Sequence, residues 1–336
     1  MKILVIGLGS MGKRRIRNLQ ANNIINIHGF DQREDRRNEA AQLYGIPVHT
    51  AFEAALKEKF DAFIISVPPD KHDIYIADAI KLGTPAFIEA SVLDTEFTSF
   101  IRQANEKKVL LCPSCTLFYH PAIKKIFEIV RKRELGVISN VVYHSGQYLP
   151  DWHTYEAVAD YYVSNKATGG AREIVPFELT WLTKLFGYPK KITGFYKKTI
   201  HIKGAEDIED TYNALMEYDG FILNLTVDVV SRYATRRLVI NGDKKQLVWS
   251  WDQNEIRIFD PEKEKWESIS YDTLSSQDGY NKNITEQMYI EEIATFLAAI
   301  KKVEQFPNTL EDDHKVLRLL YAIEKSNDSN QIQAFA

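Results

Sequence analysis

Hydrophobic and polar residues alternate with a regular rhythm over the first third of the chain. Short apolar runs, typical of strands buried on both faces, are separated by longer segments with helical periodicity. The predicted strands span residues 2–6, 25–30, 47–49, 62–66, 85–88 and 109–112. The predicted helices span residues 13–22, 36–44, 51–57, 72–82 and 95–107. This alternation of strand and helix predicts a parallel, doubly wound sheet of the α/β class.

The pattern changes after Pro113. A helix predicted at 122–132 is followed by strands of alternating polarity at 137–145, 192–196, 212–218, 221–229, 237–241, 246–249 and 256–259, and by helices at 286–302 and 312–326. Strands that follow one another predict a large, mostly antiparallel open sheet in an α+β domain. Together with the length of 336 residues, this predicts two domains. They span residues 1–120 and 121–336, with 312–326 as the closing helix.

The first predicted strand runs directly into Gly7-Leu8-Gly9-Ser10-Met11-Gly12, a G-x-G-x-x-G turn, and a helix follows at once. The first glycine permits the tight turn, the second permits close approach of a diphosphate, and the third lets the helix pack against the strand. The N–H groups and positive dipole end of that helix then face the diphosphate. We therefore expect a Rossmann-type domain that binds a dinucleotide through Gly7, Gly9, Ser10, Met11 and Gly12.

Asp31 ends the second predicted strand, 24 positions after Gly7. A carboxylate at this place accepts hydrogen bonds from the adenosine ribose of NAD, although an aspartate here can also simply cap a loop. Arg33, Arg36 and Arg37 follow, and any of them could hold the 2′-phosphate of NADP. Because an aspartate repels that phosphate, NAD is favoured over NADP.

Charge and apolar content limit the partners. The net charge of −4 gives no footprint for nucleic acid. The densest basic run, residues 13–17, either faces the phosphates or forms a solvated helix face. No apolar stretch of about 18 residues predicts a membrane span, and a strand that begins at Lys2 leaves no room for a signal peptide. We therefore expect a cytoplasmic protein with neither nucleic acid nor membrane as a partner.

The two cysteines, Cys112 and Cys115, follow a predicted strand as a C-x-x-C pair. Two cysteines do not make a disulfide framework, and without a second pair they do not make a zinc site. They are predicted to be buried thiols, and no metal is expected.

Further short motifs follow the glycine turn in order along the chain. They are Val67-Pro68-Pro69-Asp70-Lys71-His72, His120-Pro121-Ala122, Leu135-Gly136-Val137-Ile138, Gly169-Gly170-Ala171 and residues 311–326. In this order and spacing the chain resembles the glucose–fructose oxidoreductase/inositol dehydrogenase family, also called Gfo/Idh/MocA, over nearly its whole length. The resemblance implies an NAD(P)-dependent oxidoreductase that acts on a CH–OH group. It also implies a homo-dimer or homo-tetramer formed through the open sheet, and places Pro68, His72 and Glu89 near the nicotinamide.

Two departures from that family concern the chemistry. Where the family usually carries Glu-Lys-Pro, with a catalytic lysine, this chain has Glu89-Ala90-Ser91. The family's active-site helix usually carries an Asp and, four residues later, a His. Counted from Gly169-Gly170, these places fall on Ile174 and Glu178; counted back from Leu185-Phe186-Gly187, the His place falls on Phe177. Neither register has a histidine.

Other residues could take over the proton transfer. Glu178 lies on an otherwise apolar helical segment, where partial desolvation would raise its pKa. Pro176 would lie in the first turn of this helix. The alternative for Glu178 is a structural pair with Arg172 or Lys184.

Lys166, on the loop before this helix, could replace the missing lysine or be a solvated loop residue. His153 is a second acid–base candidate, and Arg172 could bind a carboxylate or phosphate of the substrate.

The segment 147–172 is long, polar and aromatic, and loops of this kind are often functional. Trp152, Tyr155 and Tyr162 offer apolar faces with polar tips, which suit a sugar, or else they pack between the domains. The sequence thus favours an oxidoreductase acting on a sugar, a sugar acid or a nucleotide-activated sugar. The alternative is a catalytically degenerate dinucleotide-binding or sensor protein of the same fold.

Overall fold

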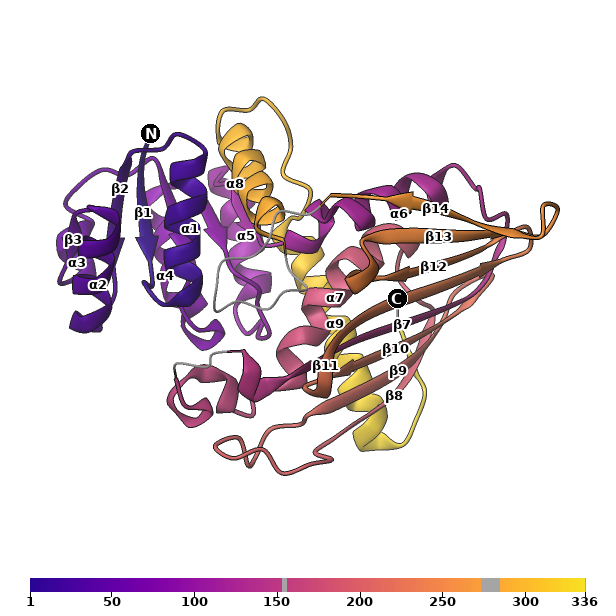
Figure 1. Cartoon of the computed structure of the whole chain (residues 1–336). Coiled ribbons are helices and arrows are strands. Elements are labelled where there is room, and N and C mark those ends of the chain that lie inside the picture. Colours follow the sequence, from indigo (N-terminus) through magenta and orange to yellow (C-terminus); the bar gives the residue numbers. More distant parts are fainter. Residues whose placement is uncertain (153–155, 273–284, 336) are drawn as a thin grey trace. The chain divides into compact units, whose positions relative to one another are not determined.

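The computed structural model describes residues 1–152, 156–272 and 285–335 (Figure 1). The chain divides into two compact units, the first of which contains Met1–Thr116 and Tyr289–Lys315. The second contains Leu117–Met288 and Val316–Ala336. In this division a segment near the C-terminus, Tyr289–Lys315, returns to the first unit, whereas the predicted domains span residues 1–120 and 121–336; those bounds stay a prediction.

The first unit is built around a parallel sheet, as the alternating pattern predicted. Residues 1–116, all of which the structure describes, contribute six strands in the order β3-β2-β1-β4-β5-β6. The strands are β1 Lys2–Ile6, β2 Asn26–Phe30, β3 Val48–His49, β4 Ala62–Ile65, β5 Ala86–Ile88 and β6 Leu111–Pro113. The helices that connect them are α1 Ser10–Ala21, α2 Glu34–Tyr44, α3 Phe52–Ala55, the 3-10 turn η1 Pro69–Lys71, α4 His72–Leu82 and α5 Phe97–Lys107. The strand order reverses beside β1, which is the arrangement of dinucleotide-binding sheets.

Helix α8, Glu286–Ile300, explains why the chain returns to the first unit. The guanidinium groups of Arg14 and Arg15 lie 4.3 and 5.2 Å from the ring centre of Tyr289. The Phe296 ring lies 5.7 Å from that of Phe87 on β5. Arg14 and Arg15 are only 2% and 0% exposed. The interpretation as a solvated helix face is therefore wrong for these two arginines, whose cations lie over aromatic rings.

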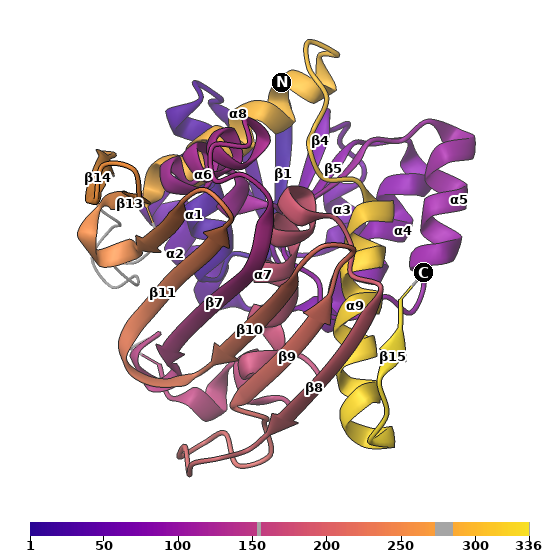
Figure 2. The same ribbon diagram turned by 90° about the vertical axis from the view of Figure 1, so that its right-hand side faces the viewer.

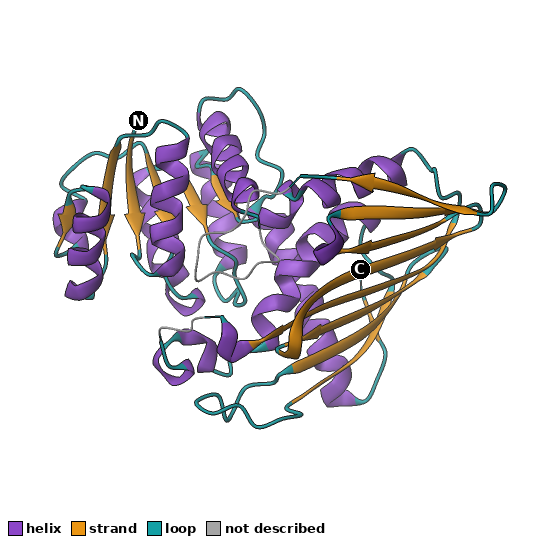
Figure 3. Ribbon diagram, in the orientation of Figure 1, coloured by secondary structure: helices purple, strands orange, loops and turns teal. Residues whose placement is uncertain are grey.

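The second unit is built around a mostly antiparallel sheet, as predicted (Figure 3). In its described residues the strand order is β14-β13-β12-β11-β7-β10-β9-β8-β15, in which only the β10–β7 pair is parallel. The strands are β7 Ile138–Tyr148, β8 Lys191–Lys197, β9 Thr211–Glu217, β10 Ile222–Asp228, β11 Val230–Gly242, β12 Gln246–Ser250, β13 Glu255–Asp260, β14 Lys265–Ser270 and β15 Gln333–Ala334. Strand β14 is absent from the sequence prediction.

Helices cover one face of this sheet, and the other face is open (Figure 2). The longer helices are α6 Pro121–Arg131, α7 Ala171–Phe186 and α9 Leu310–Ser329. The 3-10 turns are η2 Thr116–Tyr119, η3 Leu149–Asp151, η4 Val158–Asp160, η5 Tyr162–Ser164 and η6 Trp251–Gln253. The open face carries exposed apolar side chains, namely Val142, Leu215 and Ile222. The homo-dimer or homo-tetramer predicted through this face stays a prediction.

Helix α7 begins earlier than the sequence suggested. Its first residue, Ala171, follows Gly170 in the left-handed region (φ 65°), and the Ala171 amide donates to the Glu209 carbonyl at 3.0 Å. Pro176 therefore lies inside the helix, which corrects its predicted place in the first turn. The acidic residue in the first turn is Glu173, and Glu178 lies about two turns along.

None of the helices in the described ranges is long and apolar enough to cross a membrane.

Candidate active site

The turn between β1 and α1 has the backbone that its glycines predicted. Gly7 has φ 90°, and a Cβ there would lie 2.5 Å from the carbonyl oxygen of Ser66. A Cβ on Gly12 would lie 1.8 Å from the carbonyl oxygen of Gly7. No side chain caps the N-terminus of α1 at Gly9. The amides that begin α1, at Ser10, Met11 and Gly12, thus form a helix N-terminus of the kind that binds phosphate.

Asp31 lies directly after β2 and is joined to this turn. Its Oδ2 atom accepts a hydrogen bond from the Leu8 amide at 2.7 Å, and its Oδ1 atom accepts one from the Arg33 amide at 2.9 Å. The guanidinium of Arg36 lies 3.9 Å from Oδ2. The side chain of Arg33 points to Asp35, with which it forms an exposed ion pair at 2.6 Å. The Arg37 guanidinium donates to the backbone carbonyl of Asp31 at 2.8 Å. Of the three arginines, Arg36 is thus the one that lies beside the predicted ribose-binding carboxylate.

His72 ties together the loops that follow β4 and β5. Its Nε2 atom lies 3.0 Å from the carbonyl oxygen of Val67, and its Nδ1 atom lies 3.2 Å from the Ser91 hydroxyl. Since a carbonyl only accepts, Nε2 carries the proton and Nδ1 accepts from the hydroxyl. Burial lowers the pKa of His72 to about 4, so it stays neutral. His72 positions the loop that carries Pro68 and cannot readily exchange a proton.

Glu89, at the end of β5, is held by the buried guanidinium of Arg15. The Nε and Nη2 atoms of Arg15 donate to the two carboxylate oxygens of Glu89 at 2.6 and 3.0 Å. The Nη1 atom of Arg15 lies 2.9 Å from Oε2 of Glu292 on α8. Thr116 donates to the same Glu292 oxygen at 2.7 Å. Glu89 is therefore a fixed carboxylate rather than a mobile base, and its place near the nicotinamide stays a prediction.

Glu178 lies at the centre of a buried polar cluster in the second unit. Its Oε1 atom accepts hydrogen bonds from Arg236 at 2.7 Å and from Ser145 at 2.8 Å. Its Oε2 atom accepts from the Tyr143 hydroxyl at 2.6 Å and from the Trp181 indole at 3.1 Å. Both Glu178 and Arg236 are almost completely buried, at 0% and 1% side-chain exposure. The cation beside Glu178 is thus Arg236, from β11, and not one of the two cations that the sequence suggested.

Full burial with a bonded cation is the environment of a structural ion pair. Burial and the adjacent Glu178 carboxylate raise the pKa of the Tyr143 hydroxyl well above its usual range, so Tyr143 stays a donor. Because Arg236, Ser145, Tyr143 and Trp181 already donate hydrogen bonds to its two oxygens, we infer a structural role for Glu178 in place of the predicted catalytic one.

Glu173, five residues earlier on α7, has a different environment. The Tyr162 hydroxyl, from η5, donates a short hydrogen bond to its Oε1 atom. Its Oε2 atom is buried and has no hydrogen-bond partner among the residues that the structure describes. Burial raises the pKa of Glu173 to about 7, although the Tyr162 hydrogen bond acts in the opposite direction. Glu173 is therefore a carboxyl group that can change its protonation near neutral pH.

Sequence reasoning missed Glu173, although the chain holds a signal for it. Counted back from Leu185-Phe186-Gly187, the aspartate place of the family's helix falls on Glu173. The prediction used the other register for this place and found Ile174. The uncertainty of one residue therefore concealed a conservative replacement of Asp by Glu.

The other predicted residues of the second unit have varied surroundings. Lys166 is 66% exposed at its side chain and lies 2.9 Å from Glu209, whose carboxylate raises the pKa of the ammonium. Arg172 donates to Glu324 on α9 at 2.6 Å and to the Ala167 carbonyl at 2.6 Å. Arg172 therefore joins α7 to α9, which leaves its predicted substrate contact without structural support.

The predicted aromatic residues are only partly placed. The Trp152 indole N–H is buried and has no partner in the described ranges. Tyr162 contacts Glu173 and packs edge-on against Tyr161, with ring centres 6.3 Å apart. His153 and Tyr155 lie outside the described residues.

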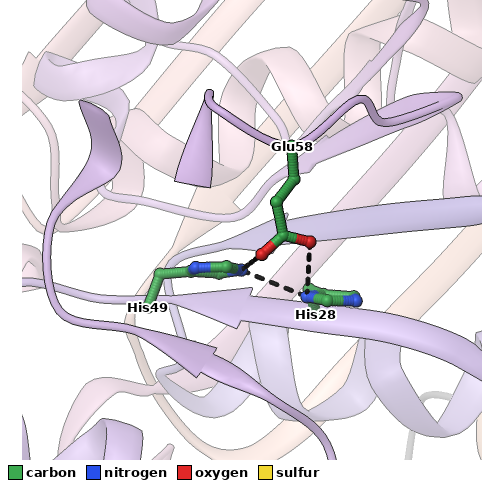
Figure 4. Close-up of side chains that lie close together, drawn as sticks. All are labelled: His28, His49 and Glu58. Atoms are coloured by element: carbon green, nitrogen blue, oxygen red, sulfur yellow. Dashed lines mark hydrogen bonds and ion pairs between the residues drawn. The ribbon is translucent and has the colours of Figure 1, made fainter. Parts of the chain in front are cut away.

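One group of side chains in the first unit has the residue types of a metal site (Figure 4). His28 on β2 and His49 on β3 have ring nitrogens 3.1 Å apart, and each nitrogen lies 3.9 Å from one oxygen of Glu58. The Lys2 ammonium contacts the same carboxylate. Burial, followed by the charge of Lys2, lowers the pKa of His28. The Lys2 ammonium offsets the charge of Glu58, and the two imidazoles are within hydrogen-bond distance of each other. The expectation of no metal stays a prediction.

Two family models match the chain. A model of an oxidoreductase family with an NAD-binding Rossmann fold matches residues 1–111, and a model of the GFO/IDH/MocA C-terminal domain matches residues 123–248. Together they cover more than half of the sequence, and they confirm the resemblance on which the sequence analysis relied. None of the curated proteins compared with the chain matches it.

Solved structures of similar fold include three that span the whole chain. Levoglucosan dehydrogenase in complex with NADH is 13% identical, with a TM-score of 0.85 and coverage of 100% of this chain and 99% of that one. An oxidoreductase domain protein from Kribbella flavida is 17% identical, with a TM-score of 0.85 and the same coverages. GenD2 from gentamicin A biosynthesis, in complex with NAD, is 17% identical, with a TM-score of 0.81 and coverages of 100% and 96%. Identities this low show a shared fold.

Proposed function

Since the chain belongs to the Gfo/Idh/MocA family of oxidoreductases, we propose that it transfers a hydride between a nicotinamide dinucleotide and a CH–OH carbon. The observation that carries this proposal is the turn between β1 and α1. There Gly7 and Gly12 leave no room for a side chain, and no side chain caps α1. The Asp31 carboxylate, bonded to the Leu8 amide, lies beside that turn.

The residues of the first unit support the binding of a dinucleotide. The uncapped amides at the start of α1 bind the diphosphate, and the fixed carboxylate of Asp31 accepts hydrogen bonds from the adenosine ribose. A Cβ on Gly9 would meet only the Arg36 guanidinium, at 3.3 Å, so backbone and ligand can approach closely there. The bound nicotinamide supplies the centre that accepts or donates the hydride.

We propose NAD rather than NADP as the cofactor. The carboxylate of Asp31 lies where a 2′-phosphate would be repelled. The Arg36 guanidinium is 3.9 Å from Oδ2 and partly offsets that charge, while the Arg37 guanidinium donates to the Asp31 backbone carbonyl. An added phosphate would therefore have to share Arg36 with Asp31.

We propose a sugar, a sugar acid or a nucleotide-activated sugar as the substrate. Trp152, Tyr161 and Tyr162 precede α7 and combine flat apolar faces with polar tips, which suits a ring with an apolar face and a rim of hydroxyls. Among the similar structures, levoglucosan dehydrogenase is named for a sugar-derived substrate.

The test is a turnover assay of the purified protein. NADH or NADPH is mixed with a panel of keto-sugars and nucleotide-activated keto-sugars, and the absorbance of the reduced nicotinamide is followed. We expect oxidation of NADH by at least one member of the panel, with NADPH less effective. Binding of NADH without turnover across the panel would favour the alternative, a dinucleotide-binding or sensor protein that has lost catalysis.

A further inference from the structure

We propose that Glu173, oriented by Tyr162, exchanges the proton of the substrate hydroxyl and so replaces the lysine and histidine that this chain lacks. This inference rests on the proposed function and adds the residue that performs its acid–base step. Glu173 would be a catalytic residue, and Tyr162 a positioning residue that acts through it.

The position of Glu173 is fixed by the way α7 begins. Gly169 and Gly170 allow a close approach, since a Cβ on Gly169 would lie 2.0 Å from the Val163 carbonyl oxygen. The Gly170 amide donates to that same carbonyl at 3.1 Å. These contacts join the start of α7 to η5, so that Tyr162 of η5 meets Glu173 in the first turn of the helix.

The two oxygens of Glu173 differ in a way that suits proton exchange. Oε1 accepts the Tyr162 hydroxyl and is therefore held in place. Oε2 is buried and has no hydrogen-bond partner among the described residues. An unpartnered buried carboxylate oxygen is costly, and native structures keep such atoms mainly where a function needs them. A substrate hydroxyl that donated to Oε2 would satisfy it.

The surroundings of Glu173 place its protonation equilibrium near neutral pH. Burial raises its pKa to about 7, while the hydrogen bond from Tyr162, the titratable group in contact with it, lowers the pKa. The neighbouring cations in the sequence, Arg172 and Lys166, each form an ion pair with another glutamate. Both protonation states are thus populated near pH 7, which is the condition for efficient acid–base catalysis.

The step balances in both directions. In oxidation the bound nicotinamide would accept the hydride of the substrate carbon, and the proton of the breaking O–H bond would pass to the carboxylate of Glu173 as the C=O bond forms. In reduction the protonated Glu173 returns that proton to the carbonyl oxygen while the carbon gains the hydride.

Other candidates in the described residues are tied to different tasks. His72 is neutral and has both nitrogens bonded. Glu89 is held by two bonds from Arg15, and both oxygens of Glu178 accept hydrogen bonds. Glu173 combines a raised pKa with an oxygen that has no hydrogen-bond partner among the described residues. Asp313 shares both features but belongs to the first unit.

The first test is Glu173→Gln in the full-length protein, assayed with NADH and a substrate identified in the panel. Glutamine keeps the shape and can accept from Tyr162, but it cannot exchange the proton. We expect a loss of kcat of about 10²- to 10⁴-fold with little change in NADH binding. Glu173→Asp should recover part of the loss. The matched control is Glu128→Gln, on the exposed surface of α6, which should retain full activity.

The pH dependence separates a catalytic from a structural effect. For the unaltered protein, the rate of alcohol oxidation should rise with pH through the pKa of Glu173, and the rate of carbonyl reduction should fall over the same range. In Glu173→Gln this pH-dependent limb of the rate profile should be absent, and a low rate that does not change with pH should remain. A variant that was merely destabilised would keep the limb.

A second readout needs neither substrate nor cofactor. In an infrared pH titration of the unliganded protein, a protonated-carboxyl band should disappear with a midpoint near 7, the pKa of Glu173. Glu173→Gln should lack that band. Asp313→Asn should instead lose a separate band with a midpoint near 8.

The outcomes distinguish this inference from the proposed function. If the unaltered protein turned over no member of the panel, both would fall. If it turned over a substrate and Glu173→Gln kept the rate and the pH limb, or if the band near 7 persisted in that variant, only the role of Glu173 would fall.

Discussion

Two glutamates on helix α7 have nearly the same sequence surroundings and opposite environments. Glu178 is 0% exposed and bonded to Arg236, and donors from Tyr143, Ser145 and Trp181 complete its shell. Glu173 has Tyr162 as its donor and one buried oxygen without a partner in the described part of the chain. Five positions along one helix thus separate a structural anion from a titratable acid.

The difference lies in the donors and cations around each carboxylate, and not in burial alone. Both groups lose water, which disfavours the charged form. Around Glu178 the Arg236 guanidinium and three neutral donors give hydrogen bonds to both carboxylate oxygens. At Glu173 the single hydroxyl of Tyr162 does not compensate fully, and the pKa rises to about 7. A buried carboxylate is therefore a candidate acid only where its compensation is incomplete.

The largest effect that would test this comparison is the loss of the Glu178 charge. Glu178→Gln leaves the Arg236 cation buried without its counter-ion, so we expect the free energy of unfolding to fall by about 3–5 kcal/mol. Equilibrium urea unfolding followed by tryptophan fluorescence measures the loss. Glu128→Gln, on the surface, should stay within about 0.5 kcal/mol of the unaltered protein.

The double variant Glu178→Leu with Arg236→Met checks the cause, because it removes both charges and should recover much of the lost stability. If Glu178→Gln were instead as stable as the unaltered protein but inactive, Glu178 would regain the catalytic role that the sequence suggested.

Asp313, in the first unit, provides a further comparison with Glu173, because it is another buried carboxyl group with a raised pKa. Burial, followed by the charges of Asp312 and Asp94, raises the pKa of Asp313 to about 8. This lies above the value of about 3.9 in an unfolded chain. Its stabilising contribution is therefore complete below the unfolded pKa and is lost as the pH rises through the folded one.

Between about pH 6 and pH 8, the ionisation of Asp313 should lower the free energy of unfolding of the unaltered protein by about 2 kcal/mol. The Asp313→Asn variant, which has no carboxyl group there, should not show this loss. Thermal or urea unfolding at the two pH values measures this difference. Turnover should not change, since Asp313 has no place in the acid–base step. If Asp313→Asn were as inactive as Glu173→Gln, a raised pKa would no longer distinguish Glu173.

Short-range patterns carried the correct sequence predictions. The turn from Gly7 to Gly12, and Asp31 at the end of the next strand, depend on local backbone and on neighbouring parallel strands, and both lie as expected. The alternation of strand and helix likewise predicted the parallel sheet. These features need few distant contacts to be specified.

Distant contacts account for the failures. From the sequence, Arg14 and Arg15 could be taken for surface cations. They are buried because α8, more than 270 residues along the chain, places the Tyr289 ring beside them. The environment of Glu178 is set by Tyr143 on β7 and Arg236 on β11, neither of which a helical pattern can reveal. Glu173 was missed for a simpler reason, a shift of one residue in an aligned motif.

The smallest predicted effect concerns the hydroxyl that Glu173 accepts. Because the Tyr162 hydrogen bond lowers the pKa of Glu173, Tyr162→Phe should raise that pKa by about one unit. The rising limb of alcohol oxidation then moves to higher pH, and the rate near pH 7 falls about three- to tenfold. Carbonyl reduction, which needs the protonated acid, should change much less. Kinetic pH profiles in both directions measure the shift.

The matched control is Tyr196→Phe, which removes another tyrosine hydroxyl that donates to a carboxylate, that of Asp328 at 2.7 Å. It should leave both profiles in place. A displaced limb in Tyr162→Phe alone would show that Tyr162 acts through the protonation of Glu173. If the limb did not shift and the rate were lower at every pH, Tyr162 would contribute only packing. The raised pKa of Glu173 would then be due to burial alone.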